Sequence, residues 1–129
     1  MNRIKLFIHE PSINEVIGRE LDLMLNEKLN LVDVVAEIDK MIRSKGTFPI
    51  PDYHSLLHMI YNPVTNRFYN QVAISAYKHS GQLLNVRDDP KRELPNGTTV
   101  TLIPAGGCIS EWEEAIDLEA FFEAISRCK

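Results

Sequence analysis

The sequence lacks a basic excess and a membrane-length apolar run, and each absence removes a class of protein. Its 129 residues carry 14 lysines and arginines against 18 acids, with no basic stripe that could neutralise nucleic-acid phosphates. No apolar run approaches the roughly 18–20 residues that a membrane span needs. Arg3 and Lys5 are followed by no signal-type apolar region with a small-residue cleavage site. We therefore expect a cytoplasmic protein with neither a nucleic-acid nor a membrane partner.

Cysteine is scarce, and catalytic sequence signatures are missing. The two cysteines, Cys108 and Cys128, both lie in the last 22 residues, where we expect reduced thiols. Cys108 has neither a histidine at a catalytic spacing nor a nearby positive charge that would activate it. Nucleophile-elbow, Walker-type and dinucleotide-binding motifs are absent. These absences predict a protein that is not an enzyme, with no catalytic residue and no cofactor.

Histidine is also too sparse to indicate a metal centre. His54 and His58 are four residues apart, a spacing that would place both rings on one face of a helix. Residues 53–61 are instead interpreted as a strand, in which these two rings would lie too far apart to share one metal ion. His9 and His79 add no ligand spacing. We expect no metal site.

What the chain does contain predicts a single globular domain that opens strand, strand, helix. Its hydrophobic content of 44% and charged content of 25% are ordinary for such a domain. Apolar residues alternate with polar ones over residues 4–8 and 20–25, which predicts two antiparallel strands interrupted by a connection at residues 11–14. Asn30 is a good N-cap, and the apolar residues after it recur every three or four positions, which predicts a helix over residues 31–45.

The middle of the chain predicts a hairpin and then a short strand. Residues 56–61 and 67–77 flank a turn-rich link at residues 62–66, and residues 83–86 form the short strand. A loop then leads to Leu94. The face of the hairpin expected to be buried contains Val72, Ile74 and Ala76.

A turn, one apolar strand and a proline follow. Asn96-Gly97 is a strong turn signal because both residues tolerate positive φ. Residues 98–103 alternate threonines with Val100 and Leu102, which predicts a strand. Pro104 ends that strand because it has no N–H group to donate to a sheet.

Gly106 and Gly107 come next and complete a pattern that resembles a known family. A leucine, a glycine turn, a hydrophobic strand, a proline and a diglycine end the ubiquitin-like β-grasp sulfur carriers, such as the molybdopterin-synthase small subunit and the thiamine-pathway carrier. The family's usual Gly-Asp turn is Gly97-Thr98 here. The resemblance implies an α+β fold of the ubiquitin-like β-grasp type over residues 1–107, with an inserted hairpin near residues 50–80.

The resemblance also implies a chemistry for the diglycine. In the family, an ATP-dependent adenylating enzyme of the ubiquitin-activating type adenylates the terminal glycine carboxylate, and sulfur then replaces AMP to give a thiocarboxylate. Gly106 and Gly107 occupy the matching positions. In this chain, however, Gly107 is in amide linkage to Cys108. The carrier interpretation therefore requires a processing protease that removes residues 108–129.

Residues 108–129 form a second region, which is predicted to be an acidic amphipathic helix. Ser110 and Glu113 form a capping box. This region carries six acidic and two basic residues, which accounts for the whole net charge of −4. Its apolar side predicts contact with a hydrophobic surface, through residues that include Trp112, Ile116 and Phe122. This tail favours an alternative function, a non-catalytic β-grasp adaptor or subunit that keeps its helix and binds protein.

Overall fold

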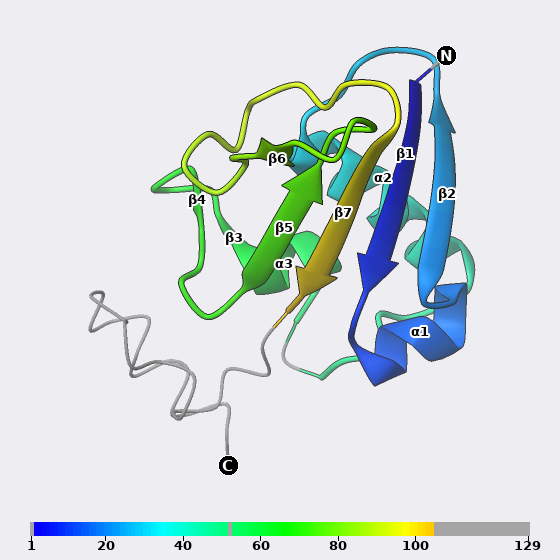
Figure 1. The fold of residues 1–129 in the computed structure, drawn as a ribbon. Coiled ribbons are helices and arrows are strands. Elements are labelled where there is room, and N and C mark those ends of the chain that lie inside the picture. The colour runs from blue at the N-terminus through cyan, green and yellow to red at the C-terminus, as the bar shows by residue number, and fades with distance from the viewer. Residues whose placement is uncertain (1, 52, 105–129) are drawn as a thin grey trace.

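The computed structural model describes residues 2–51 and 53–104 (Figure 1). Alternating apolar residues build a five-stranded sheet in the order β2-β1-β7-β5-β6. Its strands are β1 (Asn2–Ile8), β2 (Glu20–Leu25), β5 (Ala73–Tyr77), β6 (Leu83–Leu84) and β7 (Thr98–Ile103). The predicted tail helix lies outside the described residues, as does the boundary of the predicted domains at residue 107.

The first and last strands lie side by side at the centre of the sheet. β1 pairs with β7 in parallel, with Leu6 opposite Val100, while β2 pairs with β1 and β5 pairs with β7 in antiparallel fashion. This confirms the strands predicted over residues 4–8, 20–25 and 98–103, and the antiparallel pairing of the first two. A parallel pair needs a crossover connection, and the chain between β1 and β7 supplies it.

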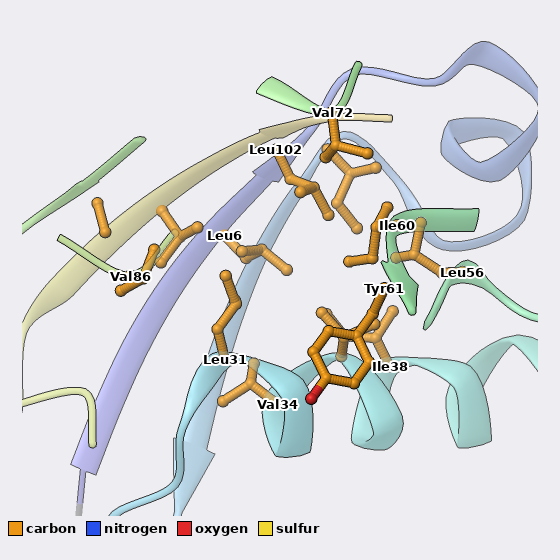
Figure 2. Close-up of a cluster of buried hydrophobic side chains, with 14 of the residues drawn as sticks. Leu6, Leu31, Val34, Ile38, Leu56, Ile60, Tyr61, Val72, Val86 and Leu102 are labelled. Carbon is orange, nitrogen blue, oxygen red and sulfur yellow. The ribbon is translucent and has the colours of Figure 1, made fainter. Parts of the chain in front are cut away.

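The helix predicted over residues 31–45 is present as α2 (Leu31–Ser44) and packs against one face of the sheet. Asn30 caps it, because its side-chain oxygen accepts a hydrogen bond from the backbone N–H of Asp33 at 2.8 Å. Figure 2 shows Leu6 and Leu102 directed from the sheet toward the side chains of α2. All of the core side chains that this figure labels are buried: Leu6, Leu31, Val34, Ile38, Leu56, Ile60, Tyr61, Val72, Val86 and Leu102.

The connection between β1 and β2 is a helix, α1 (Pro11–Ile17), where the sequence pattern indicated only an interruption. Pro11 stands in the first turn, where a missing N–H group costs nothing because no helical partner exists for it. The Glu10 carboxylate accepts a hydrogen bond from the N–H of Ile13 at 2.8 Å and caps the helix. Pro11 is therefore the first residue of a helix and does not merely interrupt the two strands.

The strand predicted over residues 56–61 is wrong. Residues 56–60 form the helix α3 (Leu56–Ile60). Ser55 caps it by accepting from the N–H of His58 at 3.0 Å. Asp39 of α2, which is only 4% exposed, accepts hydrogen bonds from the N–H groups of Leu56 at 2.7 Å and Leu57 at 3.1 Å. The backbone N–H groups in the first turn of a helix have no acceptor within that helix, and Asp39 supplies one. A contact from α2 therefore stabilises α3 in a segment whose sequence pattern indicated a strand.

A hairpin does span the turn at residues 62–66, but it is short and separate. β3 (Tyr61–Asn62) and β4 (Arg67–Phe68) pair antiparallel as a two-stranded sheet. The strand predicted over residues 67–77 is thus divided between β4 and β5. The expected inward face is confirmed, because Val72 and Ala76 are buried and Ile74 packs against the core.

Arg87 joins the segment between β4 and β5 to the loop after β6. Its guanidinium donates hydrogen bonds to the carbonyl oxygens of Tyr69, at 3.2 Å, and of Val72. Burial lowers the pKa of Arg87 from its ordinary value, but the group stays charged because an arginine titrates so far above neutral pH.

Candidate functional site

The chain leaves the sheet from its central strand. The β7 backbone is held to its last residues, since the N–H of His9 donates to the Leu102 carbonyl at 2.9 Å. Ile103, the final residue of β7, is 44% exposed, and Pro104 is buried. The described chain stops there, two residues before the diglycine.

The site residues that the sequence indicates are therefore not placed. The structure neither brings them together nor separates them, and their roles stay predictions. The residues concerned, all outside the described ranges, are Gly106, Gly107, Trp112, Ile116 and Phe122.

The turn that starts β7 is tied to β1 by backbone hydrogen bonds. Asn96 Oδ1 accepts from the N–H of Arg3 at 2.7 Å, and the N–H of Gly97 donates to the Arg3 carbonyl at 2.8 Å. Gly97 has a φ of +87°, and a Cβ added there would lie 2.8 Å from the Cβ of His79. The predicted turn is confirmed, and glycine is required both by the backbone angle and by the contact with His79.

One face of the sheet, here named the open face, is turned away from α2 and α3. Figure 1 looks onto this face, with α2 and α3 behind the sheet. Strand register places Thr101 between Phe7 and Ser75, and places Thr99 between Lys5 and Tyr77. The side chains that make up the open face are Arg3, Lys5, Phe7, Glu20, Asp22, Met24, Ala73, Ser75, Tyr77, Leu83, Thr99, Thr101 and Ile103.

The charges of the open face gather on β1 and β2. Arg3 Nε donates to Asp22 Oδ1 at 2.8 Å and to Oδ2 at 3.1 Å, and Arg3 Nη2 also pairs with Oδ2. These hydrogen bonds lower the pKa of Asp22 from its ordinary value. Lys5 lies 3.3 Å from the Glu20 carboxylate. Each cation thus has a carboxylate partner, and this half of the face is close to neutral.

The half formed by β7, β5 and β6 carries no charge and exposes large apolar groups. Tyr77 is 43% exposed and Leu83 is 63% exposed, and register places them directly opposite each other. Ile103 lies at the other end of the same half, opposite Ala73. The alternation of residues 73–77 predicts which of these side chains point into the core. It does not indicate that the outward side chains, such as Tyr77, stay exposed.

A shallow cavity of about 260 Å³ lies at the end of the open face where β7 begins. Its lining joins the turn at Gly97 to the basic residues of β1. The residues around it are Arg3, Lys5, His79, Gly97, Thr98 and Thr99. Because Arg3 and Lys5 are paired with Asp22 and Glu20, the lining offers polar groups for hydrogen bonding rather than an unpaired positive charge.

The histidine pair lies elsewhere, before and within α3. The rings of His54 and His58 stack at 5.2 Å between centroids, and the N–H of His54 donates to His58 Nδ1 at 3.1 Å. The expectation that these rings lie far apart is wrong, because Ser55 starts a helix between them. Nowhere in residues 2–51 and 53–104 do three metal-ligating side chains converge. Within the same residues, no helix has the length and apolar character to cross a bilayer.

Comparison with known proteins supports the fold. No family model matches the sequence, and no curated protein matches it. Among solved structures, the small archaeal modifier protein 1 of H. volcanii matches with a TM-score of 0.50 at 10% identity, over 81% of this chain and 98% of that one. Urm1 of Sulfolobus solfataricus matches with a TM-score of 0.43 at 19% identity, over 78% of this chain and 99% of that one.

The first of these likenesses and the strand order define the same architecture. A mixed sheet with parallel first and last strands at its centre and a helix across one face is a β-grasp fold. The α+β fold of the β-grasp type expected from the sequence is therefore confirmed for the described residues. At this identity the likeness establishes the fold alone.

Proposed function

We propose that this chain is a ubiquitin-like modifier of the sulfur-carrier type, whose Gly107 becomes a carboxyl terminus and is activated there. The observation that carries the proposal is the course of β7. This central strand, parallel to β1, ends at Ile103 and leads to Pro104, beside a sheet face that no part of residues 2–51 and 53–104 covers. The sequence places the side-chain-free pair Gly106-Gly107 immediately beyond, where a narrow channel of a partner could admit it.

The chemistry needs three steps, and none of them requires an acid or base from this chain. Hydrolysis of the amide between Gly107 and Cys108 consumes one water and leaves a carboxylate on Gly107. That carboxylate attacks the α-phosphorus of ATP, which forms an acyl adenylate and releases pyrophosphate. Hydrosulfide from a sulfur donor then attacks the acyl carbon, AMP leaves, and a thiocarboxylate remains.

The partners follow from those steps. A processing protease makes the first cut, and an ATP-dependent adenylating enzyme of the ubiquitin-activating type performs the second. The uncharged half of the open face, with Tyr77 and Leu83 exposed at the end away from the chain exit and Ile103 exposed beside the exit, offers such an enzyme an apolar docking area. The diglycine then needs only to be thin and flexible.

The proposal is tested with a chain that ends at Gly107, incubated with ATP, a sulfide source and the adenylating enzyme of the source cells. Intact-mass measurement should show the exchange of one oxygen for one sulfur. A chain of the same length carrying Gly107→Phe should fold but show no gain, because its side chain blocks a narrow channel. The full-length chain should also show none. Equal gain by Gly107→Phe, or no gain by any form, would reject the carrier function.

A second candidate function rests on the exposed apolar residues themselves. A non-catalytic β-grasp adaptor would keep residues 108–129 and use Leu83, Tyr77 and the apolar side of its tail to bind protein. It predicts that only full-length protein is found in the source cells. It also predicts that deletion of the tail lowers the solubility or stability of the chain.

A further inference from the structure

The uncharged half of the open face is left uncovered by all of the described chain. Leu83, Tyr77 and Ile103 are three of the five large hydrophobic side chains that are exposed among the described residues. The half-buried threonines of β7, Thr99 and Thr101, connect the two ends of this half. Exposed apolar side chains on one sheet face that no described segment covers make this face a candidate docking surface.

The chain itself supplies a segment of matching length at the matching place. β7 ends at Ile103, on the open face, and 25 residues follow Pro104. Residues 110–126, which number 17, would span about 25 Å as a helix. The six residues of β7 span roughly 20 Å. The intervening residues contain Gly106 and Gly107, which readily adopt the positive φ angles that a reversal of direction requires.

The chemistry of the two surfaces also matches. The sequence places apolar residues of the tail at helical spacing, on the side that contains Trp112, Ile116 and Phe122. The acidic residues of the tail fall on the opposite side of that helix, so they would stay in solvent when the apolar side docks.

We propose that in the uncleaved chain residues 110–126 fold back as a helix onto the open face, antiparallel to β7, and bury Ile103, Tyr77 and Leu83. The tail then acts as an intramolecular cover, with the diglycine held in the reversal. Its removal would free the face and the Gly107 carboxylate together. This last consequence rests on the proposed function, whereas the docking itself does not.

Paramagnetic broadening in the full-length chain tests the docking. A nitroxide on Cys128, in a chain with Cys108→Ser, should cause a loss of amide signal at Thr99 and Lys5, the end of the face farthest from the chain exit. A nitroxide on Cys108, with Cys128→Ser, should affect the Ile103 end in either case and serves as the positional control. Broadening from Cys128 that is spread evenly over the surface would overturn the proposal.

A matched pair of variants locates the contact. Leu83→Glu places a charge in the uncharged half and should abolish the broadening of Thr99. Val64→Glu makes the same change at the 87% exposed tip of the β3–β4 hairpin and should leave the broadening intact. Both side chains are exposed, so neither change should unfold the sheet, and the dispersion of amide signals checks this. Identical behaviour of the two variants would contradict the assigned face.

Two further outcomes are informative. Isotope-labelled chain mixed with unlabelled, nitroxide-bearing chain should show no broadening; if it does, the occupant is a second copy and the proposal is wrong. No activating enzyme takes part in these experiments. A failure of docking therefore leaves the mass gain of the chain ending at Gly107 unaffected, and a failure of that gain leaves the docking result standing.

Discussion

The two faces of one sheet have opposite characters, although the same strands build both. In β7, Val100 and Leu102 point to the covered face and are fully buried, whereas Ile103 beside them is 44% exposed. Period-two alternation of the side chains makes this separation possible within a six-residue strand. One set of residues determines the stability of the fold. The other set, on the open face, contributes less to the core and is available to solvent or to the proposed partners.

The largest contrast between the faces should come from neighbours in β7. Leu102→Ala removes a fully buried side chain and should lower the free energy of unfolding by about 2–5 kcal/mol. Ile103→Ala trims a side chain on the open face and should cost about 1 kcal/mol or less. Urea unfolding midpoints of the two variants measure the difference. Equal losses would mean that the open face is part of the core.

The next effect concerns the buried carboxylate behind the sheet. Asp39→Ala leaves the N–H groups of Leu56 and Leu57 without their acceptor and should cost about 1–3 kcal/mol. Asp33→Ala, an exposed change in the same helix, is the control and should cost about 0.3–1 kcal/mol. A loss for Asp39→Ala no greater than the control would show that α3 forms without this contact.

The same carboxylate gives a pH dependence with a defined sign. Burial raises the pKa of Asp39, against the opposing effect of its hydrogen bonds from Leu56 and Leu57. The folded state therefore holds the proton more tightly than the unfolded state, so this contribution to stability is full below the ordinary pKa. It is lost as the pH rises through the raised value. The advantage of the wild type over Asp39→Ala should shrink accordingly, as measured by urea midpoints at a series of pH values.

A smaller effect is expected where the open face begins. Gly81→Ala and Gly97→Ala both place a side chain at positive φ, +91° and +87° respectively, which should cost about 1–2 kcal/mol each. Only at Gly97 would the new Cβ also meet His79. Gly97→Ala should therefore be the more destabilising of the two in thermal unfolding. A Gly81→Ala variant that is as unstable as Gly97→Ala would argue against the contact with His79.

The smallest effect should come from the charged half of the open face. Asp22→Asn removes the carboxylate that pairs with Arg3, but both groups are solvent-exposed and screened. We expect a slight fall in the urea midpoint at low salt and almost none at about 1 M salt. A large fall that persists at high salt would mean that this ion pair contributes to the fold.

Sequence patterns predicted β1, β2, β7 and α2 because the signals for these elements lie within their own residues or next to them. The alternation in β1 and β7 and the N-cap at Asn30 need no knowledge of distant residues. Helix α1 was missed although Pro11 in a first turn is a local helix signal. Helix α3 was missed for a deeper reason, because Asp39, 17 residues earlier, holds its first turn.

The candidate site was predictable only in part. The resemblance at the end of the chain drew attention to Gly106 and Gly107, which remain predictions. The open face could not be assembled from the sequence, because Tyr77 and Leu83 meet Thr99 and Lys5 only through the order of the strands. Strand order depends on pairing across long separations, and residues 46–90 carry no local signal for it.

The most direct test of the central claim is the intact mass of this protein isolated from its source cells. If the last strand delivers a diglycine for activation, a species that ends at Gly107 should be present, and its amount should fall when the processing protease is inhibited. Finding only chains that still carry residues 108–129, under conditions where the protein is in use, would contradict the carrier function and leave the adaptor function in its place.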